Sequence, residues 1–362
     1  MSGDAPGRDL TGARKADHLR IVLEEDVAGA GITTGLERVR FVHQALPEID
    51  LADVDTSTTL LGRPLAAPLV ISCMTGGVAR GGEINRVLAS AAQEAGVAMG
   101  LGSQRAALDD PALARTFAVR DVAPDVPLLA NIGAAQLGAA DAVAMCRRVV
   151  DMAQADALVI HANPLQEALQ PEGTTAFAGL LDRIGEVAAA LPVPVIVKEV
   201  GWGIAENVAR ELAARGVAGV DVAGAGGTSW SEVERRRIHD PVMARAAEAF
   251  RDWGIPTVDC VLGCRRALPD GIVIASGGLR TGVDVAKCIA LGADAAALAA
   301  PLLHAAVAGR DAVRDALAVL IAGLRIAMFS VGAPTVTELR ATPRISRTDT
   351  TGDPGSVQST LP

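Results

Sequence analysis

The chain has 362 residues and a formal net charge of −9 at pH 7, and half of its residues are apolar. This length fits two ordinary domains or one large α/β barrel, and the apolar half is enough for a large core. The acidic balance and the lack of a dense basic run argue against a nucleic-acid partner. No apolar run reaches about 18 residues, and the polar N-terminus lacks the apolar stretch of a secretory signal. We therefore expect neither a membrane span nor export.

The five cysteines are odd in number and scattered, and only Cys260 and Cys264 lie close together. This pair lacks the second cysteine or histidine pair that a zinc site needs. We therefore expect reduced, mostly buried thiols and a cytoplasmic protein. Because the chain has only five Phe, three Trp and no Tyr, its core must consist of Ala, Val, Leu and Ile.

In chain order, residues 1–60 are predicted to form an N-terminal extension, and 61–340 a barrel domain. Within 61–340, eight short apolar runs alternate with alanine-rich segments of helical period. The runs are PLVISC (68–73), VAMGLG (97–102), PLLANI (127–132), ALVIHA (157–162), PVIVKEV (194–200), VAGVDVAG (217–224), IVIASGG (272–278) and AAALAA (295–300). Eight βα units in series predict a TIM (β/α)8 barrel. A doubly wound sheet is the alternative, but no Gly-x-Gly-x-x-Gly follows the first run.

Two segments depart from this regular spacing. Residues 224–271, between the sixth and seventh runs, are about twice as long as a normal unit. They predict a long loop over the catalytic mouth, where it can act as a lid. Residues 341–362 are polar and rich in Pro, Gly and Thr, so we predict a disordered tail.

Glycines follow the last strands, at the end of the barrel where active sites lie. Gly277 and Gly278 end the seventh run just before a helix, and GGT (226–228) follows the sixth. Free backbone N–H groups and a helix N-terminus bind phosphate well, so these loops predict a phosphate site. The alternative for one glycine pair is a tight turn.

Lys198 lies in an otherwise apolar strand and needs an anion or a hydrogen-bonding ring as a partner. The alternative is a salt bridge to Glu199 or to another carboxylate of the barrel wall. With Thr75, Ser103 and Asn131 also at strand ends, the mouth suits a planar polar ring with a phosphate tail, and FMN fits this description.

A polar cluster ends the fourth run, in the stretch ALVIHANPLQEALQPEGTT (157–175). His161, Asn163, Gln166 and Glu167 follow a buried strand directly. Glu167 is a candidate Mg²⁺ ligand, since Mg²⁺ often takes one or two carboxylates plus phosphate oxygens and water. The alternative is an Asn-Pro turn with solvated Gln and Glu.

Seven motifs together resemble the type 2, FMN-dependent isopentenyl-diphosphate delta-isomerases. They are RKADHL (14–19), MTGG (74–77), GLGSQR (100–105), IHANPLQEALQPEG (160–173), VIVKEVGWG (195–203), GAGGTSW (224–230) and SGGLRTGVDVAKCIALGA (276–293). The His-x-Asn-x-x-Gln-Glu and Arg-Lys-x-x-His elements are the specific ones. The resemblance implies a TIM barrel that interconverts isopentenyl and dimethylallyl diphosphate.

The resemblance also implies roles for individual residues. Substrate contacts are expected from Arg14, Lys15, His18, Ser103, Gln104, Arg105 and Gln166. The residues expected around the flavin are Met74, Thr75, Gly76, Ser103, Asn131, Lys198, Thr228, Gly277, Gly278, Arg280, Ala299 and Ala300. Catalytic positions are expected at His161, Asn163 and Gln166, and the metal ligand is expected to be Glu167. Without the resemblance, Arg14 and Lys15 would be interpreted as a solvated basic terminus.

The implied chemistry adds one proton and removes another, with no net redox change. The resemblance implies that reduced FMN is required, that NADPH reduces it, and that a Mg²⁺ ion and a homo-oligomer (tetramer or octamer) are involved. We expect the reduced ring to be the acid–base, with Gln166 orienting the alkene. The alternatives are an FMN-linked oxidoreductase barrel and a non-catalytic FMN- or phosphate-binding barrel. The oxidoreductase is disfavoured because no His adjoins Arg280 and GAGGTSW carries no Cys.

Overall fold

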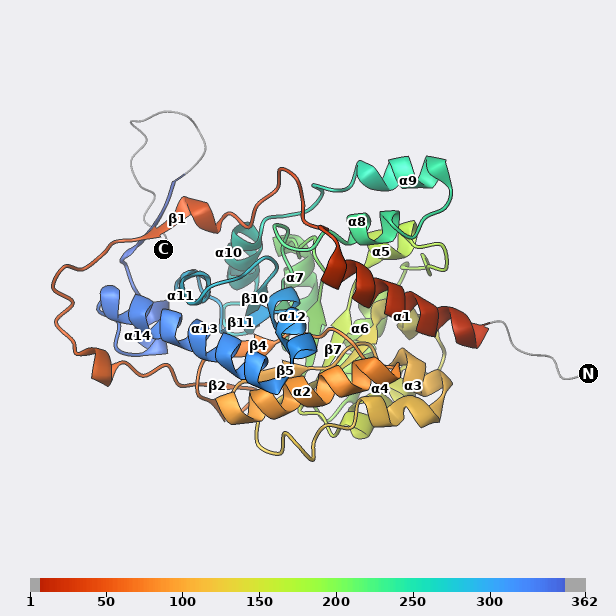
Figure 1. Cartoon of the computed structure of the whole chain (residues 1–362), viewed down its shortest axis with the longest axis horizontal. Helices are drawn as coiled ribbons and strands as arrows, with labels where there is room; N and C mark the ends of the chain where they lie inside the picture. The colour runs from red at the N-terminus through yellow and green to blue at the C-terminus, as the bar shows by residue number, and fades with distance from the viewer. Residues whose placement is uncertain (1–6, 349–362) are drawn as a thin grey trace, which may run out of the picture.

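Eight parallel strands close into a barrel at the centre of the molecule (Figure 1). The computed structural model describes residues 7–348, with side chains from residue 14 onward. The barrel strands are β4 (Leu69–Ile71), β5 (Ala98–Gly100), β6 (Leu128–Gly133), β7 (Ala157–His161), β8 (Val195–Lys198), β9 (Gly219–Asp221), β10 (Ile272–Ser276) and β11 (Ala295–Leu298). Each coincides with one of the eight apolar runs, and β11 pairs with β4 to close the ring. The predicted TIM barrel is confirmed.

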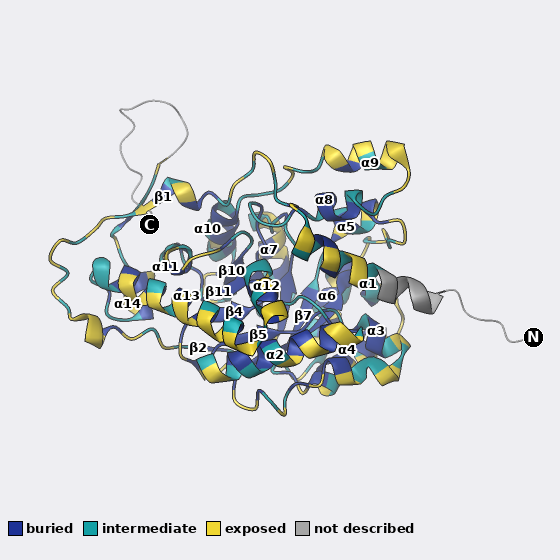
Figure 2. Ribbon diagram, in the orientation of Figure 1, coloured by how far each residue is buried: buried dark blue, intermediate teal, exposed yellow. Residues whose placement is uncertain are grey.

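The two-residue alternation along each strand divides the core into an inner and an outer part. Val70, Leu129 and Ile196 point into the barrel, together with several alanines. Leu69 and Ile71 point outward and pack against the helices. Because Ala occupies many inner positions, the barrel fills its interior without aromatic side chains. Figure 2 shows the strands as a buried centre within a shell of half-exposed helices.

Helices lie around the barrel, on its outside and at its catalytic mouth. They are α2 (Ala79–Ala95), α3 (Arg105–Asp109), α4 (Ala142–Ala153), α5 (Pro164–Leu169), α6 (Leu180–Ala190), α7 (Glu206–Ala213), α10 (Thr257–Ala267), α11 (Gly282–Ala290), α12 (Ala300–Ala308), α13 (Arg310–Ser330) and α14 (Val336–Arg340). Four short 3₁₀ helices, Leu36–Arg38, Leu51–Asp53, Pro111–Thr116 and Ala134–Gly138, lie in the connections. Among the described residues, no helix combines the length and hydropathy that crossing a membrane requires.

The N-terminal extension takes three positions on the barrel. Helix α1 (Gly7–Glu24) contacts α8 (Trp230–Arg235) and α12 near the catalytic mouth. Strand β1 (Val39–Phe41) lies on the outside, and the hairpin of β2 (Thr58–Leu60) and β3 (Arg63–Leu65) places Leu60 and Leu65 in the inner core. The long loop after β9 contains α8 and α9 (Pro241–Glu248) before the barrel helix α10 begins.

One prediction about the C-terminal segment is wrong in part. Ile345–Arg347 forms strand β12, which pairs antiparallel with β1, so the polar segment is ordered at least to residue 348. Ile345 is buried. Local composition predicted disorder because it carries no information about a partner strand some 300 residues earlier. The rest of the predicted tail, 349–362, lies outside the described residues. All five cysteines are free, as expected, and four of them are buried.

Candidate active site

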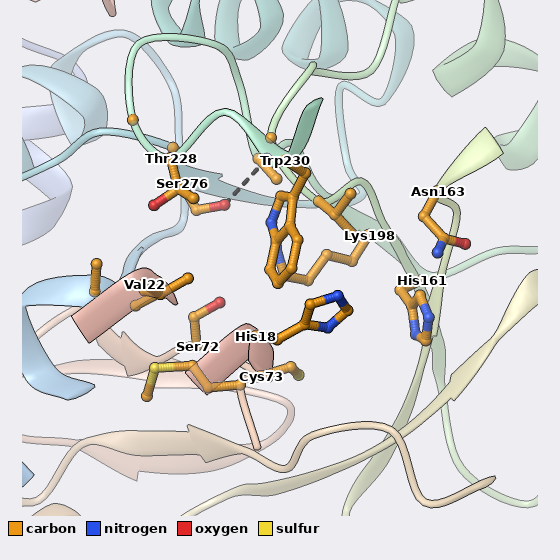
Figure 3. A pocket seen from close by; sticks show the side chains of 18 of the residues that line it. His18, Val22, Ser72, Cys73, His161, Asn163, Lys198, Thr228, Trp230 and Ser276 are labelled. Carbon is orange, nitrogen blue, oxygen red and sulfur yellow. Dashed lines mark hydrogen bonds between the residues drawn. The ribbon is translucent and has the colours of Figure 1, made fainter. Parts of the chain in front are cut away.

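A cavity of about 300 Å³ opens at the carboxyl ends of the barrel strands. Side chains from several strand ends and from α1 point into it (Figure 3). The walls include Cys73 after β4, His161 at the end of β7 and Lys198 at the end of β8. The cavity therefore lies where the fold predicts the active site.

Lys198 is buried and pairs with another carboxylate of the barrel wall, Asp221, which is the alternative that the sequence left open without naming the residue. Its Nζ lies 3.6 Å from Asp221 Oδ2 and donates to the Glu199 carbonyl oxygen at 2.9 Å. Lys198 and Asp221 are register partners on β8 and β9, which explains why they lie side by side. Ser276 donates to the other Asp221 oxygen. An Asp inside the apolar run VAGVDVAG was the available signal for this partner.

The glycine loops after β9 and β10 converge, as predicted. Gly277 and Gly278 have φ of +101° and +75°, and a methyl group on Gly278 would lie 2.4 Å from the Gly226 carbonyl oxygen. A Cβ on Gly227 would lie 2.6 Å from the Gly278 nitrogen. Only glycine permits this backbone contact, and Gly227, Gly277 and Gly278 line the cavity. The loops thus form a cradle of main-chain groups at the mouth.

Helix α1 brings a cationic edge to the same cavity. Arg14, Lys15 and His18 all line it. Lys15 Nζ donates to the carbonyl oxygens of Gly76 at 2.6 Å and Ser103 at 3.1 Å, so it ties α1 to the ends of two strands. The structure thus places the Arg-Lys-x-x-His element at the mouth, and its contact with the substrate stays a prediction.

The charges on this edge repel one another. Burial, with the nearby positive charges of Arg14 and Arg105, lowers the pKa of Lys15 to about 8. Burial also lowers the pKa of Arg14. Positive side chains held together in a partly buried cavity favour an anionic ligand, which relieves both the repulsion and the loss of solvation.

The four polar residues at and after the end of β7 lie along one wall of the cavity. His161 Nδ1 lies 2.9 Å from Asn131 Oδ1. Asn163 Nδ2 donates to Gln166 Oε1 at 3.1 Å and to Glu167 Oε1 at 3.0 Å. These contacts join Asn163, Gln166 and Glu167 into one network, whereas His161 is linked to Asn131. All four predicted residues line the cavity.

His161 is neutral at physiological pH in this environment. Burial, followed by the positive charges of Lys198 and Lys15, lowers the pKa of His161 to about 4. A neutral imidazole offers one donor and one acceptor nitrogen, so His161 can orient a ligand but carries no charge near pH 7.

Glu234, on α8, links α1 to the catalytic wall and was not predicted. It is fully buried and accepts from Gln166 Nε2 at 2.9 Å. His18 Nε2 lies 2.9 Å from its Oε1, and Arg237 pairs with its Oε2 at 2.8 Å. Burial opposes the charge, but contacts with His18, Gln166 and Arg237 lower its pKa. The sequence signal was weak, because Glu234 lies in the charged stretch SEVERRR.

An apolar part of the cavity was also missed. Leu19 and Val22 of α1 line it with Trp230 of α8. The ring centroids of Trp230 and His18 are 5.2 Å apart and meet edge to face. Cys73 lies in the same cavity, and burial raises the pKa of its thiol to about 12, so it is not a nucleophile at neutral pH.

Three predicted site residues do not line the cavity. Gln104 is fully buried, where its Nε2 donates to the Val149 carbonyl oxygen and its Oε1 accepts from the Asn131 backbone. The side chain of Asn131 contacts His161, which lies between it and the cavity. Gly76 lies against the ring of Phe117. The other predicted residues do line it: Arg14, Lys15, His18, Met74, Thr75, Ser103, Arg105, His161, Asn163, Gln166, Glu167, Lys198, Thr228, Gly277, Gly278, Arg280, Ala299 and Ala300. Gln104 belongs to a run of polar residues, but the α3 turn directs its side chain into the core.

Glu167 is the candidate metal ligand, and it lines the cavity. Its Oε2 accepts from Gln170 Nε2 at 2.9 Å and from the Thr174 backbone at 2.6 Å. The amide oxygen of Asn163 is buried and has no hydrogen-bond donor. In the described part of the chain, no three His, Cys, Asp or Glu side chains gather as a metal site.

Comparison with known proteins gives consistent results. The model of the FMN-dependent dehydrogenase family matches residues 15–116 and 133–346. The chain is 51% identical to an isopentenyl-diphosphate delta-isomerase of Nostoc sp., covering 93% of this chain and 96% of that protein. It is 52% identical to the Synechococcus sp. protein of the same name, with 87% and 91% covered. It is also 51% identical to the Xanthobacter autotrophicus protein of that name, and the match covers 92% of this chain and 97% of that protein.

Solved structures show the same fold. A mandelate oxidase variant with benzaldehyde superposes with a TM-score of 0.63 at 24% identity, and the match covers 94% of this chain and 96% of that one. At this identity the likeness concerns the fold alone.

Proposed function

This chain belongs to the isopentenyl-diphosphate delta-isomerase family, built on the FMN-dependent dehydrogenase fold, and from that premise we propose how its cavity works. The protein is an isomerase and a flavoprotein that binds FMN. We propose that it interconverts isopentenyl and dimethylallyl diphosphate with the flavin in its reduced form.

The observation that carries the substrate assignment is the cationic edge of the cavity. Arg14, Lys15 and Arg105 lie in one cavity, and their mutual repulsion needs a multiply charged anion. The apolar side chains of Val22 and Trp230 line the same space and fit a short hydrocarbon. A diphosphate ester of a small branched alkene has this combination of charge and apolar surface.

The residues present fit both expected groups. For FMN, the close backbone contact of Gly226 with Gly278 brings main-chain groups to the cavity that could hold a phosphate, and Lys198, which lines the same cavity, would hold the ring. For Mg²⁺, the Glu167 carboxylate and the unpartnered amide oxygen of Asn163 are oxygen ligands of the kind this ion prefers. We propose that Glu167 would hold the ion with the help of Asn163, and that the ion would supply positive charge for binding the diphosphate.

Bound reduced FMN would supply the proton donor and acceptor and an electron-rich surface that stabilises positive charge on the alkene. Gln166 orients the alkene, because its amide is fixed between Asn163 and Glu234. Glu234 also fixes His18, so binding of the diphosphate by α1 and alignment of the hydrocarbon depend on the same carboxylate. His161 remains neutral and positions the substrate wall together with Asn163.

Further parts of the proposal concern the setting of the enzyme. NADPH is proposed to reduce the flavin before turnover, and the protein is proposed to work in the cytoplasm as a tetramer or octamer. Substrate contacts from α1 make residues 1–60 part of the active unit. An FMN-linked oxidoreductase is less well supported, because Arg280 has no adjacent histidine to remove a hydroxyl proton.

The test is an anaerobic incubation of the purified protein with isopentenyl diphosphate, FMN, Mg²⁺ and NADPH, followed by detection of the dimethylallyl product. Omission of NADPH should abolish the product, and chemically reduced FMN should restore it. Arg14→Ala should raise KM, whereas Arg20→Ala, on the exposed side of the same helix, should leave it unchanged. Continuous NADPH consumption without product would refute the isomerase assignment and favour the oxidoreductase.

A further inference from the structure

A second cavity, of about 450 Å³, lies beside the active site and shares no lining residue with it. It lies between the ends of β7 and β8, helix α7 and the segment 253–255. Most of its walls are aliphatic, with Leu165 and Val197 as examples. The volume is in the range of small-molecule sites.

Among the described residues, Glu199 is the only charged one that lines this cavity. Successive strand residues point to opposite sides, so Glu199 faces away from the active site that Lys198 faces. One carboxylate oxygen, Oε2, accepts from four backbone N–H groups of residues 200–203, at 2.6 to 3.2 Å. The other oxygen, Oε1, has no donor among the described residues. Because Oε1 is not among the buried polar atoms that lack a partner, it is open to the cavity, where a ligand can supply a donor.

Glu199 carries a negative charge at neutral pH in spite of its burial. Burial raises its pKa to about 6, against the hydrogen bonds from the backbone of residues 200–202, which lower it. A carboxyl group with that pKa is about nine-tenths ionised at pH 7. The cavity is therefore anionic at one point and apolar elsewhere.

Two tryptophans also line the cavity. Trp202 is buried, whereas Trp253 is 60% exposed and lies at the rim with the half-exposed Val208. Indole rings attract organic cations through their π faces, and a carboxylate among aromatic rings is the usual environment for an ammonium group. The carboxylate of Glu199 and the two indole rings together favour an organic cation that carries a hydrocarbon chain.

The loop at Glu199 is shared between the two cavities. Val200 and Gly201 line the active site, whereas Glu199, Trp202 and Gly203 line the second cavity. The four hydrogen bonds to Oε2 fix these residues as one unit. A ligand that contacts Glu199 or Trp202 therefore acts on the wall of the flavin site.

We propose that this cavity is a second binding site, for a small aliphatic ammonium ion, and that its occupation is coupled to FMN binding through residues 199–203. The ammonium group lies at Glu199 Oε1, and the hydrocarbon lies between Trp202, Trp253 and the aliphatic wall. Because coupling is reciprocal, FMN and the ammonium ion change each other's affinity by the same factor.

The test is calorimetric titration of the FMN-loaded protein with n-butylammonium, with 1-butanol as the uncharged probe of matched shape. Butylammonium is expected to saturate one site and to bind at least about tenfold more tightly than butanol, the size of one charge or cation–π contact. Trp253→Leu should weaken binding by about tenfold, whereas Trp253→Phe should retain most of it. Trp253 lies outside the flavin site, so FMN affinity without the amine should be unchanged in both variants.

Several outcomes would overturn the proposal. Equal binding of butanol and butylammonium would identify an apolar cavity without cation recognition. A heat signal that rises linearly without saturation would indicate non-specific binding only. A changed oligomeric state in Trp253→Leu without any ammonium binding would assign this face to contacts between copies. An FMN affinity that is identical with and without saturating amine would remove the coupling. None of these measurements uses the isomerase substrate, so they are independent of the proposed reaction.

Discussion

Lys15 gives the sharpest prediction, because its chemistry depends on a single proton. In the free enzyme its Nζ is held by the carbonyl oxygens of Gly76 and Ser103, close to Arg14 and Arg105, and its pKa is about 8. A lysine with this pKa is about nine-tenths charged at pH 7 and about one-tenth charged at pH 9. The charged form attracts the diphosphate, so the value of kcat/KM should fall about tenfold per pH unit above pH 8.

The size of the effect follows from the contact that is lost. A hydrogen bond to a charged group contributes about 1.5–3 kcal/mol, so Lys15→Met should lower kcat/KM by about 10- to 150-fold at pH 7. Lys15→Arg keeps the charge at all accessible pH values and should remove the decline above pH 8. Because bound diphosphate stabilises the charged lysine, kcat should change less than kcat/KM in this range.

The assay is the initial rate of dimethylallyl diphosphate formation from pH 6.5 to 9.5, on enzyme loaded with reduced FMN. If Lys15→Arg kept the same decline above pH 8 as the parent, a group other than Lys15 would be responsible for the decline, against this prediction. Flavin absorbance at each pH shows whether the cofactor stays bound.

Three other predictions concern the walls of the cavity. Glu234→Gln removes the charge that fixes Gln166 and should lower kcat by about 100-fold, the usual size of a displacement of about 1 Å, with FMN affinity almost unchanged. Gly278→Ala places a methyl group 2.4 Å from a carbonyl oxygen and should weaken FMN binding by at least about tenfold, measured by flavin fluorescence. Glu167→Gln should raise the Mg²⁺ concentration for half-maximal rate by at least about tenfold.

Controls separate these effects from general loss of stability. Gly216 has a φ of +79°, similar to that of Gly278, but open space lies around it. Gly216→Ala therefore introduces the same backbone strain as Gly278→Ala without a steric clash, and it should leave FMN affinity unchanged. An equal loss of FMN affinity in Gly278→Ala and Gly216→Ala would contradict the proposal that the glycine loops after β9 and β10 hold FMN. Glu234→Gln with normal kcat would exclude Gln166 as the orienting group, and a Glu167→Gln enzyme with an unaltered Mg²⁺ requirement would place the metal elsewhere.

The sequence by itself determined the architecture, because strand and helix periods are local properties of the chain. Eight apolar runs with helical segments between them predicted the barrel and its catalytic end. That end brought Lys198, Gly278 and the polar cluster from His161 to Glu167 to one cavity, since carboxyl ends of parallel strands meet at one side.

Only the tertiary structure decided which side chains are partners. Asp221 is 23 residues from Lys198 and Glu234 is 68 from Gln166, and these pairs arise from strand register and from the position of α8. The α3 turn directs Gln104 into the core, and β1 gives β12 its partner. Sequence patterns describe what each segment prefers alone, whereas ion pairs, buried amides and edge strands depend on neighbours that the chain brings together only on folding.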